Sequence, residues 1–334
     1  MIRKNHSNSL KTTRKLAVAA CSAAIVTSFQ SAPSLAQNSV ALEEVIVTAT
    51  RRDESLQDIA VSVSAVDAEL GQATLRRLDD LQTFSPNLYI RRSPGIASGA
   101  SITIRGIGVF LGTSSGVLMQ NFDVQRIEVL RGPQGTLFGK NTTGGLINII
   151  RGDVTMEWGG DFIVTLDEHG REDVKGVVNV PIIDEKLGVK LFGAQIKSDG
   201  FVYNTTLNED VGGDDVQNYG FAAHWRPTDQ FDIKLHYEKT KDESDQGAYV
   251  NRNVQTDWTC SIYQQCVTNT ADNEDQNSSN TRNFSDTEYD TTILTANYDF
   301  GNMVLTYIGA TRDMDEQNMQ AFDASPADFL DMNY

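Results

Sequence analysis

The chain has 334 residues, with 28 Lys or Arg against 45 Asp or Glu, and its formal net charge at pH 7 is −17. A chain this acidic lacks the basic footprint that nucleic-acid binding requires, which excludes that class of function. Apolar residues make up 40% of the sequence, yet no run reaches the ~18 consecutive apolar residues of a membrane-spanning helix.

The first residues are typical of a secretory signal. The longest apolar run, Leu16 to Phe29, is followed by Ser34-Leu35-Ala36, a small-x-small cleavage site. Basic residues precede the run: Arg3, Lys4, Lys11, Arg14 and Lys15. We predict that residues 1–36 are a signal peptide removed after Ala36. A buried helix and a lipoprotein signal ending at Cys21 stay open as alternatives.

Residues 37–50 are short and extended in character. Their β-prone residues are Val45, Ile46, Val47 and Thr48. We expect no neighbouring segment to pair with them locally. From these residues alone, the segment is either the first strand of the next domain or a disordered tail.

Residues 51–121 combine strand and helix patterns. Alternation over 55–66 predicts one strand, and residues 101–106 predict another. Leucines at roughly helical spacing predict a helix over 67–84: Leu70, Leu75, Leu78 and Leu81. Pro86 and Pro94-Gly95 mark turns.

The stretch Phe122 to Ile150, FDVQRIEVLRGPQGTLFGKNTTGGLINII, is the most informative part of the chain. Its first residues alternate between the two sides of a strand: Gln125, Ile127 and Val129 on one side, Arg126 and Glu128 on the other. Glycines then interrupt the strand, and residues 146–150 form a second one. The pattern alone is equally that of a hairpin in any small mixed domain.

The letters of this stretch resemble the second half of the plug domain of TonB-dependent outer-membrane receptors. In that family an RIEVLRGPQGTLFG-type run, followed by a Gly-Gly-x-Ile-Asn-Ile strand, ends the plug just before a β-barrel begins. The resemblance implies an α+β plug domain over 51–152, and Arg105 and Arg131 become candidates for ion pairs between plug and barrel. The motif positions are Arg105, Gly106, Arg131, Gly132, Pro133, Gly135, Gly139, Gly144 and Gly145.

Two further details concern this stretch and the strand before it. The run from Gly135 to Asn141 is not a phosphate loop, because three residues separate its glycines and Asn141 stands where Ser or Thr would hold magnesium. The family's Ile-Arg-Gly strand normally leads to a loop and a further strand, whereas here Gly108 runs directly into Val109. We therefore suspect an internal deletion near 108–109, which would leave neighbouring backbone groups unpaired.

The same resemblance gives the extended segment a role. Residues 43–49 are similar to the TonB box, the peptide that the inner-membrane energy-transducing protein grips, and an exposed extended peptide can add as a strand to a partner's sheet edge. The implied contact residues are Glu43, Glu44, Val45, Ile46, Val47, Thr48 and Ala49. We expect residues 37–50 to hold this box and a linker.

Residues 153–334 are expected to form antiparallel transmembrane β-barrel strands. Seven strands are predicted near 161–168, 172–181, 186–197, 217–226, 230–240, 288–299 and 302–312. Their lengths approach the ~9–11 residues of a tilted membrane strand. A soluble sandwich would also alternate. The connections alternate in length: those at 182–185, 227–229 and 300–301 are short, and those at 198–216 and 241–287 are long. This alternation favours an outer-membrane barrel. The short turn at His169-Gly170 counts against it.

The strand count indicates an incomplete barrel. Single-chain bacterial barrels have even strand numbers, and plugged transporters use about 22 strands. The sequence therefore predicts the N-terminal part of a receptor, either a truncated product or a partial sequence.

The side chains suggest no catalytic constellation, metal site or cofactor. Cys260 and Cys266 lie in one polar loop and, in an exported protein, favour a disulfide. His224 and His236 could face the lumen from adjacent strands, as polar residues rather than as a ligand pair. The acids of the long loops either recruit a cationic substrate or form a surface bound to divalent cations among lipid headgroups.

The resemblance implies a non-enzymatic outer-membrane receptor for active uptake of a scarce nutrient, such as an iron chelate, cobalamin or an oligosaccharide. Its expected partners are a TonB-type energy-transducing protein of the inner membrane, outer-membrane lipid and the small-molecule or oligosaccharide substrate. Two alternatives belong to other classes: a non-transporting receptor remnant that still binds the inner-membrane protein, and a soluble exported β-rich protein.

Overall fold

The structure is a computed structural model, and it describes residues 46–48, 51–52, 54–67, 77–92, 100–108, 122–140, 142–167, 170–245, 275–321 and 331–333. All of them fall in one compact unit, Val45–Tyr334. Within these ranges no helix is long and apolar enough to cross a membrane.

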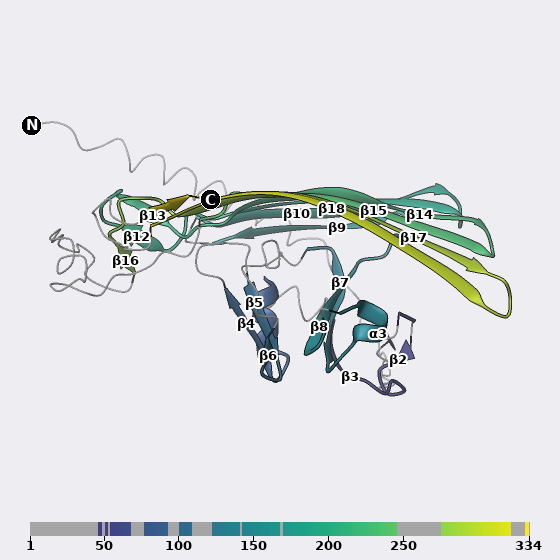
Figure 1. Ribbon diagram of the computed structural model, residues 1–334. Helices are drawn as coiled ribbons and strands as arrows, with labels where there is room; N and C mark the ends of the chain where they lie inside the picture. The colour runs from purple at the N-terminus through teal and green to yellow at the C-terminus, as the bar shows by residue number, and fades with distance from the viewer. Residues whose placement is uncertain are drawn as a thin grey trace, which may run out of the picture. The chain divides into compact units, whose positions relative to one another are not determined.

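The largest element is an antiparallel sheet of eight strands (Figure 1). In sheet order the strands are β9 (Gly159–Leu166), β10 (Glu172–Ile183), β11 (Leu187–Lys197), β14 (Asp215–Thr228), β15 (Phe231–Asp242), β17 (Phe284–Asp299), β18 (Val304–Ala321) and β19 (Asp331–Asn333). The first seven correspond to the seven predicted strands. The short β19, which pairs with the end of β18, was missed, and among the described residues β9 and β19 do not pair to close the sheet.

The two faces of this sheet differ in polarity. In the register Leu191 lies opposite Phe221, and Phe221 lies opposite Tyr237, with the Phe221 and Tyr237 ring centroids 5.7 Å apart. These side chains belong to an exposed apolar face, on which Leu191 is 50% exposed. The alternate residues, such as Lys190 and Glu238, are buried. This arrangement is the inverse of a soluble sandwich, whose polar face meets water.

The long connections at one end of the sheet carry strands of their own. Three short strands form a separate sheet: β12 (Val202–Asn204), β13 (Glu209–Val211) and β16 (Gln276–Asn277). β12 pairs antiparallel with β13 and parallel with β16, so two connections far apart in sequence are joined by main-chain hydrogen bonds. This pairing has no local sequence signal and was not predicted.

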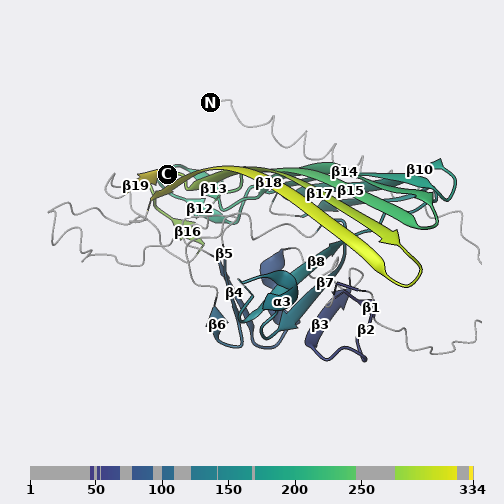
Figure 2. The same ribbon diagram turned by 45° about the vertical axis from the view of Figure 1, so that its right-hand side comes forward.

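The described residues that precede the large sheet form three smaller sheets. The first joins β3 (Ser62–Asp67), β7 (Val124–Arg131) and β8 (Gly145–Arg151). The second joins β4 (Leu88–Arg92), β5 (Ala100–Ile104) and β6 (Ile107–Gly108), and the third pairs β1 (Ile46–Val47) with β2 (Glu54–Ser55). Figure 2 shows β1 and β2 beside β3. The predicted hairpin of Phe122 to Ile150 is thus confirmed as β7 and β8.

Two apolar clusters hold these small sheets together. Val129 and Ile127 of β7 pack with Leu81 and Ile104 in one cluster. Leu130, on the other face of β7, packs with Val47 in the second. β7 therefore lies between the two clusters and is the central strand of the region.

Two short helices occur among the described residues of this region. A 3-10 helix, η1, covers Leu78–Thr83, and a four-residue helix, α3, covers Gly135–Phe138. Leu78 and Leu81, two of the leucines behind the predicted helix over 67–84, are buried on η1. Asp67 ends strand β3 and so does not belong to the predicted helix, and residues 68–76 of that prediction lie outside the described residues.

Candidate functional site

The predicted partner-contact segment has a partner within its own chain. Ile46 pairs with Ser55, and Val47 pairs with Glu54, in a short antiparallel ladder. Val47 has no exposed surface and packs against Leu130. The expectation that this segment has no local partner is wrong for these residues, because a turn brings β2 back beside β1.

A buried carboxylate holds the residue that follows β1. Glu128 has no exposed surface. Its Oε1 accepts hydrogen bonds from the Thr48 backbone N–H at 2.7 Å and from Arg126 Nε at 2.9 Å. The Thr48 hydroxyl lies 3.2 Å from each carboxylate oxygen, and Asn148 Nδ2 donates to Oε2 at 3.2 Å. Together these donors offset the desolvation of the charge.

The glycines of the plug motif allow a tight return between β7 and β8. Gly145 has φ +140°, and a Cβ at this position would collide with the Leu130 carbonyl oxygen. Gly132, at φ +95°, donates its N–H to the Gly144 carbonyl oxygen at 3.1 Å. These conformations favour glycine, so the residue type is explained by the turn itself.

The two arginines proposed for plug-to-barrel ion pairs bond elsewhere. Arg131 Nη2 donates to the hydroxyls of Ser64 and Ser85, at 2.7 and 2.9 Å. Arg105 Nη2 contacts the Ser62 hydroxyl at 3.4 Å. Both contacts stay within the plug region, so the expectation is wrong for the contacts that the described residues show.

Two other ion pairs join the end of the plug region to the large sheet. Lys190 Nζ lies 2.5 Å from Asp123 Oδ2 and also donates to the Gly152 carbonyl oxygen. Arg151, the last residue of β8, lies 2.7 Å from Glu238 on β15. The Lys190 side chain is 1% exposed. Burial raises the pKa of Asp123, and the charges of Lys190 and Arg151 oppose that rise.

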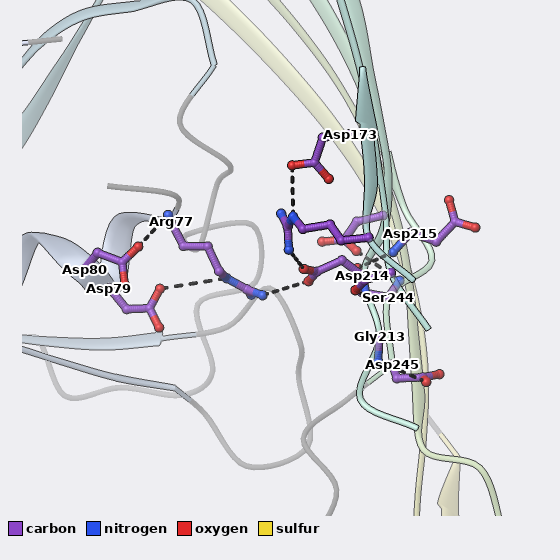
Figure 3. Close-up of polar contacts among 12 residues, drawn as sticks. Arg77, Asp79, Asp80, Asp173, Gly213, Asp214, Asp215, Ser244 and Asp245 are labelled. Carbon is purple, nitrogen blue, oxygen red and sulfur yellow. Dashed lines mark hydrogen bonds and ion pairs between the residues drawn. The ribbon is translucent and has the colours of Figure 1, made fainter. Parts of the chain in front are cut away.

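A third connection runs through Asp214, which lies just before β14 (Figure 3). Its Oδ1 is 3.1 Å from Nη1 of Arg77, the residue before η1, and its Oδ2 is 3.2 Å from Nη1 of Arg171. Arg171 also pairs with the buried Asp173 at 3.0 Å. Asp80 accepts a hydrogen bond from the Arg77 backbone N–H at 2.9 Å, which fixes the start of η1.

Two cavities flank Asp214 at the end of the sheet that carries the long connections. One, of about 690 Å³, is lined by residues that include Arg171, Phe201 and Asp214. The other, of about 390 Å³, has a mainly acidic lining: Asp199, Glu209, Asp210, Asp214, Asp215, Glu243 and Asp245, with Lys197 and Arg282. Both have the size of small-molecule sites. The hydrogen bond to Asp245 raises the pKa of Arg282.

The two histidines of the sheet have different partners. His224 pairs with Asp232, while His236 lies 3.2 Å from Glu238 and stacks on Phe192 at a centroid distance of 5.3 Å. No group of three or more His, Cys, Asp or Glu able to hold a metal ion occurs among the described residues.

Residues 55–146 match the family model of the TonB-dependent receptor plug domain. Residues 55–146 are therefore a plug domain of the TonB-dependent receptor type. Over 123 residues, or 32% of the chain, it is 28% identical to the vitamin B12 transporter BtuB of Vibrio vulnificus and 35% identical to the pesticin receptor of Yersinia pestis. These matches cover 20% and 18% of the two relatives, so the chain spans only a small part of their length.

The solved structures extend the likeness to the large sheet. The ferric yersiniabactin uptake receptor FyuA from Yersinia pestis superposes with a TM-score of 0.65 at 22% identity, covering 78% of this chain and 42% of that one. The ferric-catecholate import receptor Fiu from E. coli, in its closed form, gives 0.63 at 14% identity, covering 80% and 38%. The fold is therefore that of a receptor plug followed by barrel strands.

Several predicted positions lie outside the described residues. They are Glu43, Glu44, Val45 and Ala49 of the TonB-box segment, and Cys260 and Cys266 of the expected disulfide. The signal peptide and the stretch after Gly108 lie outside them as well. Sequence reasoning missed Glu128, Asp123, Lys190 and Asp214, because charged residues on a strand or at its end give no sign of a partner far away in the chain.

Proposed function

We propose that this receptor chain serves the active uptake of a scarce nutrient, such as an iron chelate, cobalamin or an oligosaccharide, across the outer membrane. One observation carries the proposal: buried ion pairs attach the plug to the polar face of a sheet whose other face is apolar and exposed. Asp123 with Lys190 and Arg151 with Glu238 make that attachment. The named relatives support the class, since they include a vitamin B12 transporter and a ferric yersiniabactin uptake receptor.

Energy for uptake would come from a TonB-type protein of the inner membrane. Residues 43–49 are the proposed contact, through strand addition to a sheet edge of the partner. The order of segments supports this role, because residues 43–49 directly precede the plug. Within the segment, Ile46 is 41% exposed and available for side-chain contact. A pull on this segment would then act on the plug.

Substrate would enter from the end of the sheet that carries the long connections. The two cavities beside Asp214 lie there, and their acids favour cationic or metal-bearing ligands over anionic ones. The same acids would also bind divalent cations among lipid headgroups. The exposed apolar face of the sheet is the proposed contact with membrane lipid.

The remaining assignments are part of the same proposal. Residues 1–36 would be a signal peptide, 37–50 the TonB box and linker, 51–152 the plug, and 153–334 the N-terminal part of the barrel. Cys260 and Cys266 would form a disulfide in an outer loop. Thiol labelling of the exported protein without reductant should leave both cysteines unmodified, and modification of both would contradict the pairing.

The function is tested in cells that lack their own TonB-dependent receptors. The chain is expressed as part of a receptor with a closed barrel, the membranes are fractionated, and uptake of labelled ferric siderophores and cobalamin is followed with and without an uncoupler. We expect outer-membrane localisation, crosslinking of residues 43–49 to the TonB-type protein, and uptake that the uncoupler stops. Crosslinking without uptake of any substrate would favour the non-transporting alternative, and recovery in the soluble fraction would overturn the receptor proposal.

A further inference from the structure

We infer that Glu128 is a latch that keeps residues 46–48 of the TonB-box segment docked on the plug and competes with the energy-transducing partner for the Thr48 backbone N–H. This inference rests on the proposed function, because it takes residues 43–49 as the partner contact. It adds a named residue of the plug that regulates access to the contact.

The competition follows from main-chain hydrogen bonding. A partner that adds its strand to residues 43–49 needs free N–H and C=O groups on that segment. In the docked state Ile46 and Val47 are already paired with β2, and the Thr48 N–H donates to Glu128 at 2.7 Å. The Thr48 group must leave Glu128 before it can donate to a partner, so docking and partner binding exclude each other at this residue.

Glu128 makes a charge-assisted contact with the described part of the segment, residues 46–48. Among the described residues, the ladder between β1 and β2 has two residue pairs, which is too short to be stable alone. Val47 adds an apolar contact with Leu130. The hydrogen bond from the Thr48 N–H to a buried carboxylate is charge-assisted, and bonds of that kind are about twice as strong as neutral ones.

Release of the segment does not leave the carboxylate without partners. Arg126 Nε stays within 2.9 Å of Oε1, and Asn148 Nδ2 stays within 3.2 Å of Oε2, both from the central sheet of the plug. Because these two donors belong to β7 and β8, they do not depend on the box. The latch can therefore open while the plug keeps its fold.

Glu128→Gln in the full chain tests the inference. The amide keeps the shape of the side chain but removes the charge, so the docked segment should be held less tightly. We expect hydrogen–deuterium exchange of residues 45–49, read by mass spectrometry, to accelerate about tenfold. The purified periplasmic domain of a TonB-type protein should bind the variant about tenfold more tightly.

Matched variants separate the latch from general damage. Glu157→Gln removes an exposed carboxylate and should change neither readout. Thr48→Val removes the hydroxyl but keeps the N–H, so a smaller acceleration, of about threefold, is expected. Thr48→Ser keeps both groups and should restore the exchange rate of the unchanged protein.

The outcomes distinguish the latch from the proposed partner contact at residues 43–49. Unchanged exchange at 45–49 in Glu128→Gln, together with normal partner binding, would overturn the latch and leave the partner contact standing. Faster exchange at 45–49 without any partner binding would support the latch and contradict the proposed contact. Equal acceleration in the β7 and β8 peptides would overturn the latch, because it would show a structural role in the plug core.

Discussion

The two ends of the plug are held in different ways. At the end that precedes the plug, Thr48 is bound to Glu128, and the carboxylate has further partners in the same small sheet. At the end that leads into the large sheet, Lys190 and Asp123 come from different parts of the receptor and depend on each other. If Thr48 leaves Glu128, the carboxylate keeps other hydrogen-bond donors. If Lys190 separates from Asp123, two buried charges lose their ion-pair partner.

From this difference we predict which of the two attachments opens first. Breaking a buried pair by leaving one charge without its partner costs about 3–5 kcal/mol. Losing one hydrogen bond to a charged group costs about 1.5–3 kcal/mol. A pull on residues 43–49 is therefore expected to free the box segment while the far end of the plug stays attached to β11 and β15.

The largest expected effect comes from Lys190→Ala at the sheet end. The substitution leaves Asp123 buried without its cation, so the free energy of unfolding should fall by about 3–5 kcal/mol. Urea unfolding in detergent, followed by tryptophan fluorescence, measures it. The double variant Lys190→Met with Asp123→Asn should recover most of the loss. If Lys190→Ala is as stable as the unchanged protein, the ion pair at the sheet end does not contribute to stability.

A smaller and more local effect is expected from Val47→Ala at the box end. The change removes two buried methyl groups, and the docking free energy of the segment should fall by about 1.6 kcal/mol, at ~0.8 kcal/mol per group. Exchange at residues 45–49 should accelerate while global unfolding by urea stays unchanged. Ile46→Ala, at a position that is 41% exposed, is the matched control with a lesser effect. A parallel loss of global stability would show that the two ends are not independent.

The sheet end should also respond to pH in a defined direction. Burial raises the pKa of Asp123 above 3.8, so the folded state binds its proton more tightly than the unfolded state does. The contribution of this group to stability is complete below pH 3.8 and is lost as the pH rises through the folded pKa. Asp123→Asn should remove that part of the decline from the pH dependence of unfolding. Identical slopes in both proteins would contradict the burial of a titrating Asp123.

The smallest expected effect belongs to the pair of Arg77 and Asp214. Their side chains are 16% and 17% exposed, so solvent screens part of their attraction. A double-mutant cycle with Arg77→Gln and Asp214→Asn should give a coupling energy of about 1 kcal/mol or less. Unfolding in detergent at low and high salt measures it, and a coupling as large as that of Lys190 with Asp123 would place a second strong attachment at η1.

The sequence predicted those parts of the fold that are written in local patterns. Alternation over Phe231 to Glu238 gave both the strand and its two faces, and the motif around Gly132 and Gly145 gave the β7–β8 hairpin. The strand pairing of Ile46 and Val47 was not predictable, because β2 contains only Glu54 and Ser55 and neither is β-prone.

Most of the candidate site depends on contacts between distant residues, which local patterns do not encode. Alternation placed Glu128 on the face opposite Val129, but only the fold shows that this face is covered by Thr48. The family resemblance assigned Arg105 and Arg131 to ion pairs with residues outside the plug. In the structure their guanidinium groups contact serine hydroxyls within the plug region.

The parallel pairing of β12 with β16 has a consequence for exchange of loops between receptors. Tyr203 pairs with Gln276, and Asn204 pairs with Asn277, so each connection supplies half of a shared main-chain ladder. Asp245 adds to this join by accepting from the Gly212 N–H and pairing with Arg282. A graft of one connection from a homologue would leave the other without its ladder. The two segments should therefore be inherited, and engineered, as one recombination unit.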